Sequence, residues 1–297
     1  MRRWVGCLLL RCSCCKLVNK QWKNDMNLCS VLHPRKAAMQ IRCCLPLPEL
    51  KRSVEVPAPV KFAIIAKVRS SEGCLLLTNG TASLQSVPSS HVRDRLLQAC
   101  SGKGSTTDVL LVWHIATTIL EVRRTTAAIS SSFDNVVVAT HLSGYCAYLV
   151  AYCPELLPDD DGWSKSLYKA VTEDARRALA VAGAGRAPEE EYKKLVRLLG
   201  AGGRHEVVER GAKLAKKLVA LAHGEGEEKA WEVLAGFWSE MILYVAPSDN
   251  LEGHAKAIAR GGELITLLWA LLTHAGVVTR PSTATATAAD HENASAV

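Results

Sequence analysis

The chain of 297 residues is 48% hydrophobic and 22% charged, which is enough apolar material for one large or two small cores and excludes a chain disordered throughout. Gly and Pro together make 31 residues, and no uncharged apolar run reaches the roughly 18 residues of a membrane span, so collagen-like, low-complexity and clear membrane-spanning classes are excluded too. Residues 1–69 hold 14 Lys and Arg against 3 Asp and Glu, whereas residues 70–297 hold 22 against 26, so the net charge of +7 comes from the N-terminal part.

Residues 1–55 are predicted to form a basic, cysteine-rich arm or membrane-proximal linker. Arg2 and Arg3 precede a short apolar run, but Arg11 interrupts it and no small-residue cleavage site follows, so we do not expect a signal peptide. The 11 cysteines are odd in number and irregular in spacing, unlike the disulfide framework of a secreted protein. These features favour an intracellular, reducing compartment.

The cysteines of the arm have three interpretations. Cys12 and Cys15 form a C-x-x-C pair that Cys29 and His33 would complete as a zinc set, although the second half has the wrong spacing. Palmitoylation of Cys12, Cys14 and Cys15 beside basic residues is the second interpretation. Free thiols are the third, and we favour it and assign no metal or cofactor.

Beyond the arm, the apolar spacing is helical. It predicts helices over residues 60–68, 92–100 and 109–122, the last with Asp108 as its N-cap. The longest apolar stretch, residues 136–157, approaches the length of a membrane span, but His141, Ser143 and the tyrosines within it oppose insertion. We therefore favour a helix buried in the core.

The later part continues as helices separated by glycines. Helices are predicted over 163–181, 188–199 and 207–222, where Lys213, Lys216 and Lys217 face outward. In residues 231–278, an apolar helix, a turn at 247–250 and a closing helix from 264 to 272 are expected to pack together. The predicted fold is all-α, an irregular multi-helix bundle over residues 56–280 with a family-specific block at 228–280. Residues 281–297, rich in Ser, Thr and Ala, are predicted to be a disordered tail.

A run of motifs in this last block resembles a known family. The motifs, as they stand here, are W-E-V-L from Trp231, F-W-S-E-M from Phe237, H-A-K from His254 and R-G-G-E-L-I-T from Arg260. They are similar to the plant family catalogued as domain of unknown function 594. Shorter segments upstream, such as W-H-I-A-T from Trp113, extend the resemblance to about Trp22. The resemblance implies no established activity, a transmembrane domain of unknown function 4220 ahead of this region in full-length relatives, and an N-terminally truncated relative here.

A set of imidazoles and carboxylates offers the groups that acid–base or metal chemistry uses. These candidates are His114, Glu121, His141, Glu240, Glu263 and His274. Their spacing matches no H-E-x-x-H or G-x-S-x-G motif, so we assign no catalytic residue and expect them to form hydrogen bonds inside the bundle. Convergence of these side chains around an open pocket would instead indicate an enzyme.

Two functional hypotheses follow. The first is a non-catalytic interaction module next to a membrane, whose arm contacts an anionic membrane surface or a protein partner. The alternative is an enzyme with a His/Glu pocket in the helical domain. A third possibility is that the arm is solvated and has no dedicated partner.

Nucleic acid is not expected as a ligand, because Trp4 and Trp22 are the only aromatic residues of the arm, and no small-molecule ligand is inferred. Relatives are expected at membranes, and this chain alone is expected to be soluble or peripheral.

Overall fold

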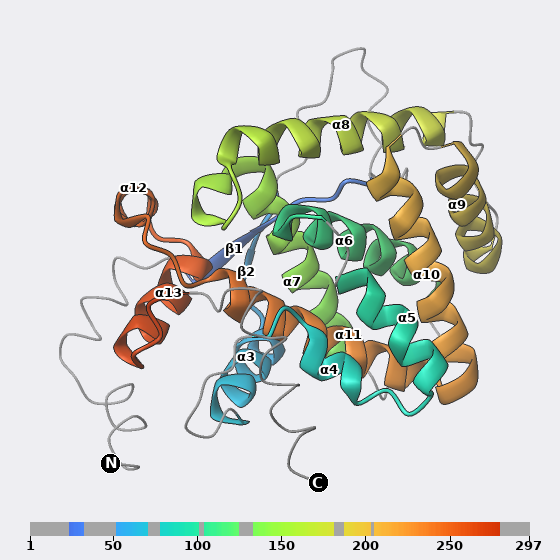
Figure 1. Cartoon of the computed structure of the whole chain (residues 1–297), viewed down its shortest axis with the longest axis horizontal. Helices are drawn as coiled ribbons and strands as arrows, with labels where there is room; N and C mark the ends of the chain where they lie inside the picture. Colours follow the sequence, from blue (N-terminus) through green and yellow to red (C-terminus); the bar gives the residue numbers. More distant parts are fainter. Residues whose placement is uncertain are drawn as a thin grey trace, which may run out of the picture.

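The computed structural model of the chain describes residues 24–32, 52–70, 78–100, 104–124, 133–180, 187–202 and 205–279. Within these ranges 78% of the residues are helical, in 11 α-helices against one two-stranded sheet, which confirms the predicted all-α multi-helix bundle (Figure 1). The helices are α3 (Ala58–Ser70), α4 (Thr81–Gln85), α5 (Ser90–Cys100), α6 (Thr106–Arg123), α7 (Phe133–Tyr152), α8 (Asp161–Ala180), α9 (Pro188–Gly202), α10 (Glu206–Glu225), α11 (Glu227–Val245), α12 (Leu251–Ala259) and α13 (Leu264–His274).

Two short strands from the predicted arm pack against the bundle. Strand β1 (Asp25–Leu28) pairs antiparallel with β2 (Arg52–Glu55), with Met26 opposite Val54. Met26 is fully buried, and the backbone N–H of Cys29 donates to the carbonyl oxygen of Gly144 on α7 at 3.0 Å. This part of the arm therefore joins the core through the buried residues Met26, Cys29, Val31 and Leu32. Residues 1–23 and 33–51 of the arm, and the predicted tail at 281–297, lie outside the described residues.

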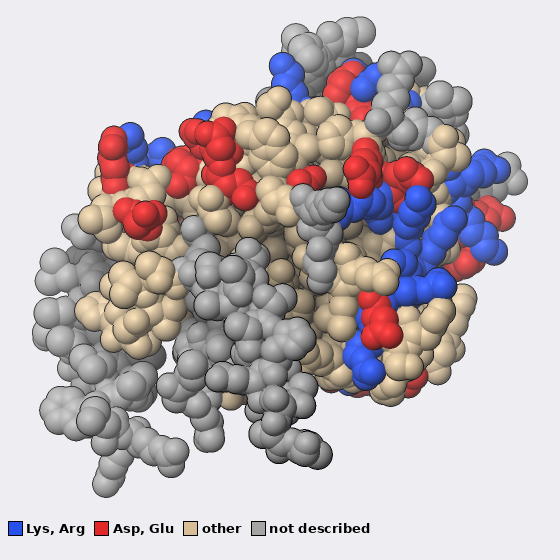
Figure 2. Space-filling view, viewed as in Figure 1, with Lys and Arg blue, Asp and Glu red and all other residues tan. Residues whose placement is uncertain are grey.

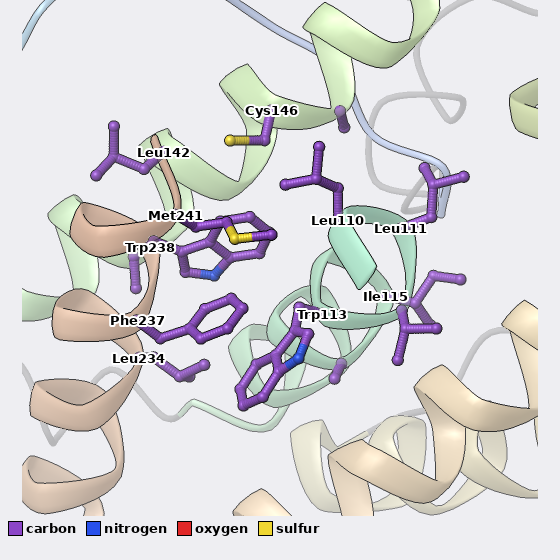
Figure 3. Packing of buried hydrophobic residues seen from close by; sticks show 14 of the residues in the cluster. Leu110, Leu111, Trp113, Ile115, Leu142, Cys146, Leu234, Phe237, Trp238 and Met241 are labelled. Atoms are coloured by element: carbon purple, nitrogen blue, oxygen red, sulfur yellow. The ribbon is translucent and has the colours of Figure 1, made fainter. Parts of the chain in front are cut away.

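The centre of the bundle forms where α6, α7 and α11 meet (Figure 3). Trp113 of α6 stacks on Phe237 of α11 with ring centroids 3.8 Å apart, and the edge of Trp238 meets Phe237 at 5.2 Å. The indole N–H of Trp238 donates to Thr117 Oγ1 at 3.0 Å, so this buried polar group is satisfied. Large aromatic side chains thus join the two helices by both packing and a hydrogen bond.

Helix α7 contains most of the stretch that approached the length of a membrane span. Twelve of its 20 residues are buried, and the 3₁₀ turn Pro154–Leu156 follows it. Among the described residues, no helix combines the length and the apolar character that crossing a bilayer requires.

Helices α9 and α10 form an antiparallel hairpin on one side of the bundle (Figure 1). Gly200 of α9 lies against Ala212 of α10, where an added Cβ would be 3.8 Å from that of Ala212. Gly211 approaches α6 so closely that an added Cβ would lie 2.6 Å from Cγ2 of Ile115. On the other side of α10 from its outward lysines, four apolar residues are all buried: Val208, Leu214, Leu218 and Leu221.

Arg123 at the end of α6 anchors this hairpin. Its guanidinium donates to Glu189 of α9 at 2.9 Å, to Glu227 of α11 at 2.8 Å and to Nε2 of His223 of α10 at 2.8 Å. Glu189 lies in the first turn of α9, and His223 lies in the last turn of α10. The Arg123 side chain therefore connects the end of α6 with the start of α9, the end of α10 and the start of α11.

Three local details differ from the sequence prediction. The N-cap of α6 is Ser105, and Asp108 is the third helical residue of a capping box, because each side chain bonds the backbone N–H of the other. Helix α12 stands between α11 and the closing helix α13, where only a turn was predicted. Trp163 of α8, which helical spacing places on the same side as the buried Leu167 and Val171, is 43% exposed.

Candidate functional site

The six predicted polar residues lie in separate places. His114 is on α6, His141 on α7, Glu240 on α11, and Glu263 immediately before α13. Glu121 and His274 are exposed residues near the ends of α6 and α13. In the described part of the chain, no hydrogen bond or ion pair joins two of the six.

His114 joins the N-terminal ribbon to α6 and α7. Its Nε2 accepts from the backbone N–H of Val31 at 3.2 Å, so its proton is on Nδ1, which donates to Ser143 Oγ at 2.9 Å. Burial lowers the pKa of His114 to about 4, with the contact to Ser143 opposing the shift in part. The ring is therefore neutral near neutral pH, and both nitrogens are already bonded.

Glu240 joins α11 to the helices at the start of the bundle. Its side chain is 3% exposed and forms an ion pair with Lys67 of α3. The Ser83 hydroxyl donates to Oε1 at 2.5 Å, and the Thr78 hydroxyl donates to Oε2 at 3.0 Å. Because Gly236, one turn earlier, has no side chain, α4 can approach closely enough to bring Ser83 to Glu240: an added Cβ would be 2.6 Å from Ser83 Oγ.

Glu263 joins the start of α13 to α7. Its carboxylate accepts from the hydroxyl of Tyr148 at 2.9 Å and from that of Tyr145 at 3.3 Å. Burial, with the nearby carboxylate as a further cause, raises the pKa of both phenols, so they remain protonated donors. Tyr145 Oη also accepts from the backbone N–H of Ile265 at 3.0 Å. The carboxylate is thus held by two phenols at the positive end of α13.

Two glycines of the R-G-G-E motif direct Glu263 inward. Gly261 and Gly262 have φ values of 108° and 83°, the left-handed region that glycine adopts without steric cost. Their backbone N–H groups donate to the carbonyls of Ile258 and Ala257 at 3.0 Å and close the end of α12. The chain then reverses into α13, so the motif has a structural explanation.

The remaining candidates make local contacts. Nδ1 of His141, a half-buried side chain, donates to the carbonyl of Val137 in the preceding turn at 2.8 Å, and burial is the main cause that lowers its pKa. Neither Glu121 nor His274 takes part in a side-chain hydrogen bond or ion pair among the described residues.

Burial disfavours the thiolate form of three of the described cysteines. Burial raises the pKa of Cys100 to about 12 and that of Cys153 to about 11, and it raises that of Cys146 as well. Cys29, a member of the hypothetical zinc set, is buried, and its Sγ lies within hydrogen-bonding distance of Tyr168 Oη at 3.4 Å. The described residues contain no group of three His, Cys, Asp or Glu able to hold a metal ion, and the other members of that set lie outside them.

An open groove lies between α9 and α10, away from all six candidates. Its volume is about 510 Å³, and Lys193, Arg197 and Lys216 rim it. The other lining residues are small or largely apolar: Tyr192, Val196, Gly200 and Ala201. Figure 2 shows Lys and Arg gathered over α9 and α10 on this face of the molecule. Lys216 was predicted to face outward, but the groove as a whole was not predicted from the sequence. The i, i+4 spacing of Lys193 and Arg197 was the available signal.

Comparison with known proteins identifies one family. Residues 223–277 match the family model described as "Protein of unknown function, DUF594", a stretch from the last turn of α10 to just beyond the end of α13. The match covers less than a fifth of the chain and supports the resemblance to domain of unknown function 594. Neither the curated proteins nor the solved structures provide a match. The plant origin, the accompanying transmembrane domain and the truncation stay predictions.

Proposed function

We propose that the protein is a non-catalytic helical interaction module that works next to an anionic membrane surface and binds partners through its surface. The observation that carries the proposal is that His114, Glu240 and Glu263 are each bonded to different partners inside the bundle. These three residues are at most 9% exposed. An acid or base that acts on a substrate must be within hydrogen-bond reach of it, which such burial does not favour.

The membrane part of the proposal is supported by charge. The net charge of residues 1–69 is strongly positive, and Lys and Arg near an anionic leaflet each contribute about 1 kcal/mol of attraction. Because β1 and β2 are bound to the bundle, any contact made by the arm would hold the helical domain close to the same surface.

Co-sedimentation of the full chain with vesicles tests this proposal. We expect binding to phosphatidylserine vesicles at low salt, release at high salt, and no binding to phosphatidylcholine vesicles. Replacing Arg2, Arg3 and Arg11 by Gln should weaken binding roughly a hundredfold, since three charges near the surface are lost.

The matched control replaces Lys165, Lys169 and Arg176 of α8 by Gln, which removes the same charge from exposed positions of the folded domain. This variant should bind almost as the wild type does. Absence of salt-sensitive binding to anionic vesicles, or an equal loss in both variants, would refute the membrane part.

A further inference from the structure

In the groove between α9 and α10, apolar residues form the floor and cationic residues form the rim. Val196 and Tyr192 form a floor that is at most 8% exposed, while Arg197 and Lys216 are exposed at the rim. The floor is therefore mainly apolar, and the rim carries long cationic side chains from both helices.

Two of the three rim cations, Arg197 and Lys216, are not neutralised by the described residues of the hairpin. None of the seven residues that line the groove is acidic. The carboxylates of the two helices lie mainly in their first turns, where Glu189 is 3.7 Å from Lys193 and Glu209 is 2.6 Å from Lys213. Arg197 and Lys216 form no ion pair within the ranges that the structure describes. These two side chains remain available to an external anion.

The shape of the groove favours one class of anion. A flat headgroup surface would meet the tips of the rim side chains and leave the apolar floor uncovered. A polypeptide segment can instead place an apolar side chain on the floor and carboxylates on the rim, where Arg binds carboxylates with a planar pair of donors. Burial of the apolar side chain would add to the electrostatic attraction.

We propose that this groove binds an acidic segment of a partner protein, with carboxylates on Lys193, Arg197 and Lys216 and an apolar side chain on Val196. This inference rests on the proposed function as an interaction module and names the class of partner. It does not depend on whether the N-terminal arm binds a membrane.

The test uses the full chain and a fluorescein-labelled peptide in which Leu alternates with pairs of Glu, compared with the same peptide carrying Gln in place of Glu. We expect the Glu peptide alone to bind, and affinity to fall about tenfold in the double variant Arg197→Ala, Lys216→Ala. Shifts of backbone NMR signals on titration should lie in α9 and α10.

The matched control is Lys165→Ala with Arg176→Ala, which removes the same charge from exposed positions on α8 and should leave affinity nearly unchanged. Thermal unfolding of both variants checks that the fold is retained. Failure of the Glu peptide to bind, equal losses in the two variants, or NMR shifts elsewhere would overturn the proposal.

Vesicle binding separates this proposal from the previous one. If the double variant loses binding to phosphatidylserine vesicles as strongly as it loses the peptide, the groove is a membrane surface and the inference is wrong. If vesicle binding depends on the arm and peptide binding depends on the groove, both proposals stand. If the wild type binds the Glu peptide but does not bind anionic vesicles, only the membrane part of the proposed function is refuted.

Discussion

The centre of the bundle and the α9–α10 hairpin use helices in opposite ways. Helix α11 buries 13 of its 19 residues, including Glu240, so its polar groups must find partners inside the protein. Helices α9 and α10 are amphipathic, with buried leucines on one side and exposed Lys and Arg on the other. Polar residues in the centre are therefore bonded inside the protein, whereas Arg197 and Lys216 of the hairpin are exposed and form no ion pair within the described ranges. The following substitutions test that division.

The largest effect is expected from Phe237→Ala in the centre. The substitution removes a ring stacked between Trp113 and the loop at Gly80, and we expect the free energy of unfolding to fall by about 3–5 kcal/mol. Chemical denaturation measures the change. Leu251→Ala on α12, where the side chain is 66% exposed, is the control and should change it by less than about 0.5 kcal/mol. Similar losses in the two variants would contradict the division.

Glu240→Ala should have the next largest effect. It removes the acceptor of Ser83 and Thr78 and the ion-pair partner of Lys67, for an expected loss of about 2–4 kcal/mol. Glu232→Ala, on the same helix but in an exposed ion pair with Lys229, is the matched control and should cost less than about 1 kcal/mol. If urea unfolding gives the same loss of unfolding free energy for both variants, the buried contacts of Glu240 do not stabilise the fold as we expect.

His114 makes stability depend on pH. Its pKa is lowered to about 4 in the fold, against about 6.5 in an unfolded chain, so the unfolded state takes up the proton first as pH falls. The contribution is complete above about pH 6.5 and is lost progressively toward about pH 4, with about 2 kcal/mol lost at about pH 5.

The measurement compares unfolding free energies of the wild type and His114→Gln across this pH range. Gln can still accept from Val31 but does not titrate, so the variant should show a shallower loss. Identical pH profiles would show that protonation of His114 is not responsible.

Arg123→Met tests how the hairpin is attached and should have the smallest effect. The variant loses bonds to Glu189, Glu227 and His223, and we expect a loss of about 1–2 kcal/mol because these partners are partly exposed. Hydrogen exchange should increase mainly in α9 and in the last turn of α10. Arg176→Met, which removes a solvent-exposed pair with Glu173, is the control for a lost charge. Uniform exchange changes across the bundle would argue against a local anchor.

The helices could be predicted because apolar periodicity is a local property. The all-α class, the buried helix α7 and the amphipathic α10 all followed from it. The β1–β2 ribbon could not be predicted in the same way, since each strand has four residues and the pairing of Met26 with Val54 spans a long separation. Helix α4, with five residues, is likewise too short for a periodic pattern.

The polar contacts were predictable only in kind. Hydrogen bonds inside the bundle were expected from all six candidates; Glu240 and Glu263 form them, whereas Glu121 and His274 form none among the described residues. The partners of the two that do could not be named, because Thr78 is 162 residues from Glu240 and Tyr148 is 115 residues from Glu263. The basic groove was missed for a related reason: it needs two helices to lie side by side, although the charges of each helix are visible in its own sequence.

The contacts that enclose α11 determine whether the stretch matched by the family model, residues 223–277, can fold when it is isolated. Phe237 of the stretch stacks on Trp113, Glu240 pairs with Lys67, and Glu263 accepts from Tyr148. None of these three partners lies within the stretch. Excised as a peptide, it would expose those groups together, and circular dichroism should find it largely unfolded. We therefore expect the whole bundle, and not the matched stretch 223–277 by itself, to be the unit that folds. Transfer of this stretch to another protein would require neighbours that replace the contacts of α3, α6 and α7.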